Sequence, residues 1–104
     1  SLFQSESSSV NPSDITGQSD PKEITLTAVV VSVMAANPSR KALLVRNKGN
    51  KMAYLGFKNT ITAANAPYAI PGGTTLEKDD DFAPGELFMV APAGNTDIVI
   101  TESY

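Results

Sequence analysis

The chain has 104 residues, of which 18% are charged, with a net charge of −3 and no Cys, His or Trp. This length fits one domain, and the missing residue types exclude disulfides, Cys/His zinc sites and any mechanism with a histidine base or cysteine nucleophile. The acidic balance argues against a nucleic-acid partner, because phosphate contacts need a basic patch.

Residues 1–23 differ in composition from the rest of the chain. They hold seven serines and only four hydrophobic residues, with four acids against one base. Such a segment cannot offset the entropy cost of ordering, so we expect an extended Ser-rich N-terminal arm (1–23) before a domain at 24–104. If the arm docks on a neighbour, its hydrophobic residues are the interface candidates: Leu2, Phe3, Val10 and Ile15. Because the arm lacks the basic start and apolar centre of a signal peptide and the chain has no bilayer-length apolar run, we expect no export signal and no membrane partner.

The first predicted strand runs from Ile24 to Val33. This run is rich in β-branched residues, and proline-containing pairs bound it on both sides. Its first half alternates apolar residues with threonines, which indicates one buried face. From Val29 to Val31 both faces are apolar, as in a strand that is central or covered by another chain. Val29 and Val31 are therefore interface candidates.

A hairpin is predicted next, with strands at 41–47 and 51–57 around the short connection 48–50. The alternating apolar residues that we expect to point inward are Leu43, Val45, Ala53 and Leu55. Arg40 and Arg46 flank the first strand. An arginine at such a position is more often solvated or internally paired, but arginine is also enriched at interfaces, so both stay interface candidates together with Tyr104.

The rest of the chain predicts short strands separated by turns. Residues 60–69 predict a short strand with an irregular loop, and Ile70–Gly73 predicts a turn. The remaining elements are an edge strand at 74–78, a turn at 79–85, and strands at 86–91 and 97–101 around the turn 92–95. No stretch of useful length has uninterrupted helical periodicity. The prediction is an all-β protein, a small antiparallel β-sandwich or barrel of about six to eight short strands.

The residues that could carry chemistry are few. The acids Glu77, Asp79, Asp80 and Asp81 lack the spacing and the glycine of a calcium-binding loop, which favours a solvated turn or sheet edge over a cation site. A serine nucleophile needs a base, and without histidine only a lysine could serve. Tyr54, Tyr68 and Tyr104 lie in separate segments, which favours core or interface packing over a carbohydrate platform. We expect no catalytic residue, no metal, no cofactor and no enzymatic activity.

The predicted domain of 81 residues has a marginal core without a disulfide to reinforce it. Association with copies of itself or with a larger assembly is the remaining source of stability, since binding to the folded state raises its stability.

Several motifs resemble the small β-sandwich virion proteins of tailed bacteriophages, of the capsid-decoration or head-fibre type. In those proteins an Asn-Pro-x-Arg turn leads into a strand that ends near an Asn, and the terminal strand ends in Glu. The matching segments here are 37–49, 54–56, 70–73, 84–87 and 97–102. The similarity lies within residues 24–104, and its motifs mark strands and turns rather than a site.

The resemblance implies a non-enzymatic structural protein that decorates or cements a phage capsid. Its implied partners are the major capsid protein and copies of itself, with a trimer favoured, on the capsid exterior after assembly in the host cytoplasm. Many weak contacts of this kind sum to tight attachment. The alternative is a host-surface or glycan-binding module of a phage fibre.

Overall fold

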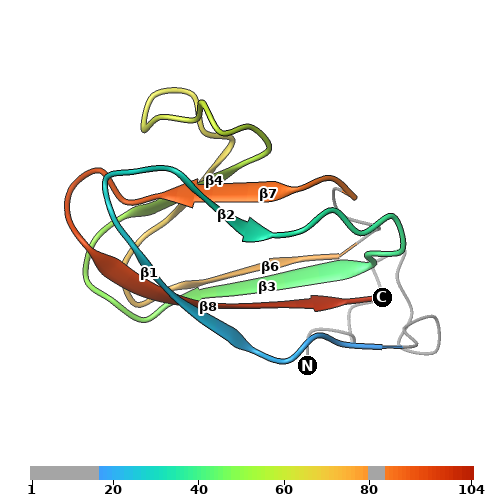
Figure 1. Cartoon of the computed structure of the whole chain (residues 1–104). Coiled ribbons are helices and arrows are strands. Elements are labelled where there is room, and N and C mark those ends of the chain that lie inside the picture. The colour runs from blue at the N-terminus through green and yellow to red at the C-terminus, as the bar shows by residue number, and fades with distance from the viewer. Residues whose placement is uncertain (1–16, 80–83) are drawn as a thin grey trace.

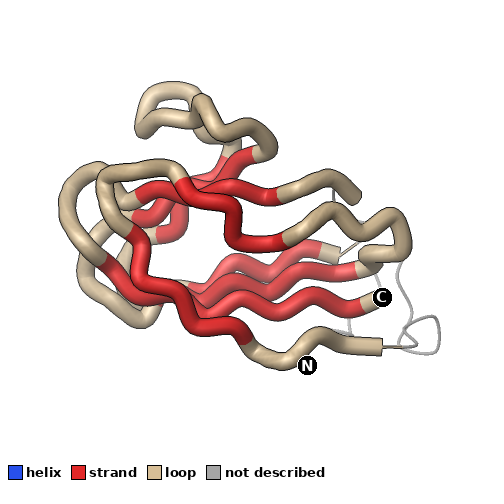
Figure 2. Tube along the Cα trace, viewed as in Figure 1, coloured by secondary structure: helices blue, strands red, loops and turns tan. Residues whose placement is uncertain are grey.

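The chain folds into two layers of β-sheet in the computed structural model, which describes residues 17–79 and 84–104 (Figure 1). Within those ranges there are eight strands: β1 (Lys22–Leu26), β2 (Val31–Met34), β3 (Ala42–Asn47), β4 (Ala53–Gly56), β5 (Tyr68–Ile70), β6 (Thr75–Lys78), β7 (Leu87–Val90) and β8 (Thr96–Ser103). Sheet A has the order β1–β8–β3–β6 and sheet B the order β2–β7–β4–β5, and every neighbouring pair is antiparallel. The predicted small antiparallel β-sandwich is confirmed, and Figure 2 shows the two strand layers facing each other.

The hydrophobic core lies between the two sheets and is built by strand alternation. Leu43 and Val45 point inward from β3, and Ala53 and Leu55 do so from β4, all at most 1% exposed. These four inward positions are as predicted. Successive side chains of a strand point to opposite faces, so the residues between them lie on the outer faces of the sandwich.

The single strand predicted from Ile24 to Val33 is wrong, because this run forms two strands in different sheets. β1 pairs with β8 in sheet A, whereas β2 pairs with β7 in sheet B. Residues 27–30 cross between the layers, and the N–H of Ala91 donates to the carbonyl of Thr27 at 2.8 Å. Both strands still bury one apolar face, with Leu26 and Val33 fully shielded. A run rich in β-branched residues has the same composition whether it forms one strand or two, so composition cannot reveal the change of sheet.

The predicted hairpin around 48–50 is also wrong. β3 lies in sheet A and β4 in sheet B, so the connection leads from one sheet to the other instead of joining paired neighbours. A second connection, between β5 and β6, packs against it. A Cβ at Gly72 would lie 2.7 Å from Cα of Asn50 and 2.8 Å from the carbonyl oxygen of Gly49. Only glycine allows these two backbones to approach so closely.

The middle of the chain follows the prediction more closely. Residues 57–67 form an irregular connection that leads into the short strand β5, at the edge of sheet B. β6 occupies the predicted edge position, next to β3 in sheet A. The two edge strands lie on the same side of the sandwich, since Lys78 Nζ of β6 sits 5.2 Å from the ring centroid of Tyr68 in β5.

A buried arginine joins three segments at the start of β3. Arg40 donates from Nε to Glu102 Oε1 at 2.8 Å, from Nη1 to the carbonyl of Gly85 at 3.0 Å and from Nη2 to that of Ala35 at 2.8 Å. Its side chain is 0% exposed and that of Glu102 is 11% exposed. This Arg40 cluster therefore ties the β2–β3 connection and the residues before β7 to the end of β8.

A second polar cluster lies at the opposite end of β3, around Asn47. The Asn47 Nδ2 group donates to the carbonyls of Lys51 at 2.7 Å and Ile70 at 2.8 Å. Its Oδ1 accepts from Thr96 Oγ1 at 2.7 Å and from the N–H of Gly49 at 3.1 Å. Asn47 is 0% exposed, and this Asn47 cluster holds the connections after β3 and β5 against the start of β8.

Residues 17–23 belong with the sandwich rather than with a separate arm. Lys22 and Glu23 are part of β1, and Gln18 forms an antiparallel bridge with Ser103. Gly17 and Tyr104 exchange backbone hydrogen bonds of 2.6 and 2.9 Å. The boundary predicted at residue 23 therefore lies too far along the chain, and β8 pairs with residues well before it.

Candidate functional site

The outer face of sheet A is charged. Glu23 forms an ion pair with Lys48, and Asp97 accepts a hydrogen bond of 2.6 Å from the hydroxyl of Thr25. Arg46 is exposed on the central strand β3 of the same face. Opposite charges interspersed in this way keep a surface well solvated. This face has the composition of an ordinary water-facing surface.

The outer face of sheet B has no charged residue in its described strands. Tyr54 lies opposite both Val90 and Ala69, and Phe88 lies opposite both Gly56 and Ser32. These positions alternate with the core residues Leu55 and Met89, which places them on the outside of the sheet. We call this set the uncharged face: Ser32, Tyr54, Gly56, Ala69, Phe88 and Val90. Gly56 and Val90 are buried, whereas Ser32 and Ala69 are exposed and Tyr54 and Phe88 are partly exposed. Glu86 lies at its rim and accepts a hydrogen bond from the hydroxyl of Ser32.

The connection between β4 and β5, residues 57–67, covers one end of the uncharged face and stands out from the sandwich in Figure 1. Ile61 is 7% exposed, and a Cβ at Gly56 would overlap its Cγ2. The absence of a side chain at Gly56 therefore lets Ile61 pack directly on the backbone of β4. This contact anchors the middle of the connection to the sheet.

Hydrogen bonds inside this β4–β5 loop fix its shape. The N–H of Thr62 donates to Asn65 Oδ1 at 2.7 Å, and the N–H of Ala64 donates to Thr62 Oγ1 at 3.2 Å. The N–H of Ala66 donates to the carbonyl of Thr62 at 3.0 Å. Compact surface loops that are packed by their own side chains are frequently functional. The loop is thus an ordered element with its own internal hydrogen bonds.

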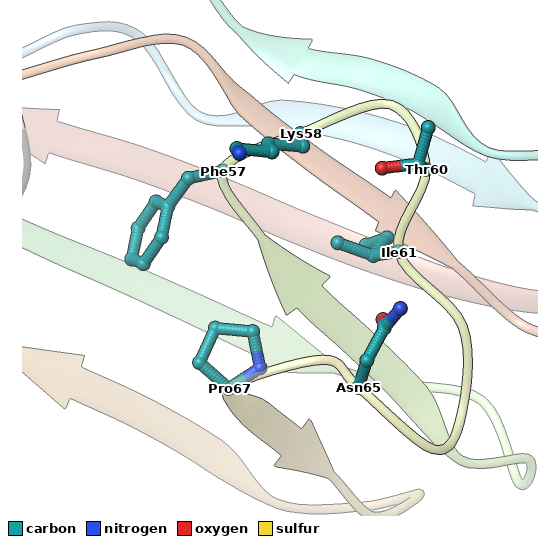
Figure 3. A pocket seen from close by; sticks show the side chains of 6 residues that line it. All are labelled: Phe57, Lys58, Thr60, Ile61, Asn65 and Pro67. Carbon is teal, nitrogen blue, oxygen red and sulfur yellow. The ribbon is translucent and has the colours of Figure 1, made fainter.

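A pocket of about 300 Å³ opens between the two ends of this loop (Figure 3). Its lining residues are Phe57, Lys58, Thr60, Ile61, Asn65 and Pro67. Phe57 is 43% exposed, and its ring meets the ring of Tyr68 edge-on, with centroids 6.2 Å apart and an interplanar angle of 87°. The pocket therefore combines an apolar wall with a polar rim.

The predicted interface residues that the structure describes do not gather at this surface. Leu2, Phe3, Val10 and Ile15 lie outside the described residues. Val29 is 69% exposed in the β1–β2 connection, whereas Val31 packs against the core.

The other three candidates are equally scattered. Arg40 is internally paired and 2% exposed, so it is not available on the surface. Arg46 is on the charged face, and Tyr104 packs with Gly17 at the end of β8.

Sequence reasoning missed the uncharged face and the Phe57–Tyr68 contact. Tyr54 was accessible to prediction, because it alternates with Ala53 and Leu55, which were correctly expected to point inward. Phe57 and Tyr68 come together only through the path of the β4–β5 loop. No local pattern encodes that path.

Within residues 17–79 and 84–104 no group of three or more acidic, His or Cys side chains is placed to hold an ion. In the same ranges every buried side-chain nitrogen or oxygen has a hydrogen-bond partner. Of the predicted acid cluster, Asp80 and Asp81 lie outside the described residues. No helix in the described part of the chain is long and apolar enough to cross a bilayer.

Compared with models of known protein families and with curated protein sequences, the chain matches none.

Proposed function

We propose that this protein is a non-enzymatic virion structural protein that decorates or cements a bacteriophage capsid. It docks on the major capsid protein, associates with copies of itself, preferably as a trimer, and sits on the capsid exterior after assembly in the host cytoplasm. The observation that carries the proposal is the contrast between the uncharged face of sheet B and the charged face of sheet A.

The uncharged face has the composition of a protein interface. Interface centres are depleted of charged residues and enriched in aromatic ones, and here Tyr54 and Phe88 stand on the adjacent central strands β4 and β7. Truncation of such central aromatic side chains commonly causes the largest losses of binding. A neutral face also meets an identical copy of itself without charge repulsion.

The motif residues of the phage resemblance support a likeness of fold. The Arg of the Asn-Pro-x-Arg turn is Arg40, and the Glu of the terminal strand is Glu102, which are ion-paired in the Arg40 cluster. The Asn at the end of the motif strand is Asn47, the centre of the other polar cluster. The quoted motif thus consists largely of residues that hold the strands in place.

Replacing Tyr54 with lysine is expected to weaken self-association at least tenfold, because it places a charge at the centre of the uncharged face. Sedimentation velocity over a concentration series measures the change, and circular dichroism confirms that the variant stays folded. Leu44→Lys is the matched control, since Leu44 is a partly buried apolar residue on the outer face of sheet A.

The control should associate like the wild type. Equal losses in both variants, or a wild-type protein that remains monomeric throughout, would contradict self-association through sheet B.

Removing residues 1–16 is expected to abolish binding to capsid shells while the sandwich stays folded. The cut is placed before Gly17 because residues 17–19 pair with residues 102–104, so a longer deletion would damage the sheet itself. Co-sedimentation of the purified protein with shells assembled without it measures the loss. Undiminished binding by the truncated protein would show that the N-terminal segment is not the docking element.

A further inference from the structure

We propose that the pocket of the β4–β5 loop binds a single pyranose unit of a glycan, and that Phe57 supplies the surface on which the sugar ring stacks. The pocket volume of about 300 Å³ suits one ring-sized ligand and lies at the small end of ligand pockets. This inference does not depend on capsid docking, since the pocket is formed by one loop of one chain.

Phe57 has the exposure and the support that stacking requires. The residue is 43% exposed, which is a high value for a large apolar side chain. The edge-on contact with Tyr68 limits the orientations that the ring can adopt. The electron-rich face of an aromatic ring attracts the slightly positive C–H groups on the apolar side of a pyranose. A ring held in this way provides a sugar-binding surface with little entropy left to lose.

The lining of the pocket also supplies polar groups for the hydroxyls of a sugar. Asn65 Oδ1 already accepts from the N–H of Thr62, so the amide orientation is fixed and its Nδ2 group is a donor. Thr60 adds a hydroxyl and Lys58 an ammonium group, and Figure 3 shows both beside the space that Phe57, Ile61 and Pro67 enclose. A purely apolar occupant would strip water from these groups without replacing it, which costs binding energy.

The loop is organised before any ligand arrives. Its internal hydrogen bonds and the packing of Ile61 on Gly56 hold the two walls of the pocket at a fixed separation. Preorganisation of this kind lowers the entropy cost of binding, which matters most for small, weakly bound ligands.

The test is a titration of the isotope-labelled full chain with neutral hexoses, N-acetylhexosamines and uronic acids, followed by amide chemical shifts. Saturable shifts confined to residues 57–67 and their neighbours are expected for at least one sugar, at millimolar concentration. Phe57→Ala should weaken binding about tenfold, as loss of an aromatic contact and its buried area implies.

Two further variants make the test specific. Asn65→Asp keeps the acceptor that holds Thr62 but replaces the Nδ2 donor, so the loop should stay folded while the affinity falls about tenfold. Val29→Ala removes an apolar side chain that is 69% exposed in the β1–β2 connection and does not line the pocket, and it should leave the affinity unchanged. Absence of saturable shifts with every sugar overturns the proposal. So does binding that Phe57→Ala leaves intact, or shifts produced only by peptides with apolar side chains.

Discussion

Replacing Arg40 with methionine is expected to lower the free energy of unfolding by about 3–5 kcal/mol, as loss of one partner of a buried ion pair does. The substitution leaves the carboxylate of Glu102 shielded from water without its counter-ion, and it strips a donor from the carbonyls of Gly85 and Ala35. The total free energy of unfolding of a small domain is only about 5–15 kcal/mol, so this loss is a large share of it. Urea denaturation followed by circular dichroism measures it.

Arg46→Met is the matched control for this prediction. Arg46 lies in β3, six positions after Arg40 along the chain, but its side chain is exposed on the charged face. Its replacement should change stability by less than about 0.5 kcal/mol, as is usual for surface positions. Similar losses in the two variants would show that the ion pair of Arg40 is not a principal support of the fold.

A double replacement separates the pair from its neighbours. Glu102→Met alone leaves the guanidinium without its carboxylate, whereas the double variant with Arg40→Met removes both charges. The double variant should therefore be less destabilised than the sum of the single ones, by the coupling energy that contacting residues show. Strict additivity would contradict a direct interaction between the two side chains.

The sequence predicted the strands of this protein better than their partners. Alternation within a strand is a local property, so the inward positions Leu43, Val45, Ala53 and Leu55 were correct. The choice of sheet is a non-local property, decided by contacts such as the hydrogen bond between Ala91 and Thr27. The split of the first strand and the crossing between β3 and β4 were missed for that reason.

The candidate surface was harder to predict than the fold. Recognition of the uncharged face requires knowing that β4 and β7 are neighbours, which brings Tyr54 and Phe88 onto one surface. The pocket requires the fold of the β4–β5 loop, which depends on Ile61 reaching the backbone of Gly56. Neither relation is visible as a periodicity or a motif.

The two polar clusters explain how a small sandwich without disulfides keeps one arrangement of connections. Strand β3 lies between β6 and β8 in sheet A, and one cluster stands at each of its ends. Each cluster binds backbone carbonyls of neighbouring connections, which would otherwise have to find other partners. Connections that are fixed in this way hold the sheet faces, and therefore the proposed interaction surfaces, in a constant orientation.

Replacing Asn47 with aspartate is expected to cost about 3–5 kcal/mol of stability, although the two side chains have nearly the same shape. Oδ1 would still accept from Thr96 and Gly49, but the donor group that binds the carbonyls of Lys51 and Ile70 would become a negatively charged oxygen facing them. Urea denaturation measures the loss.

Thr96→Val is the variant with which the stability loss of Asn47→Asp is compared. It removes only the hydroxyl that donates to Asn47 Oδ1 at 2.7 Å. Loss of this single hydrogen bond should cost about 1 kcal/mol, clearly less than Asn47→Asp. Backbone amide exchange should show where the damage lies, with faster exchange at Gly73, whose N–H donates to the carbonyl of Asn47 at 2.8 Å. An aspartate variant as stable as the wild type would mean that the connections after β3 and β5 are held by packing alone, and that the Asn47 donor pair is dispensable.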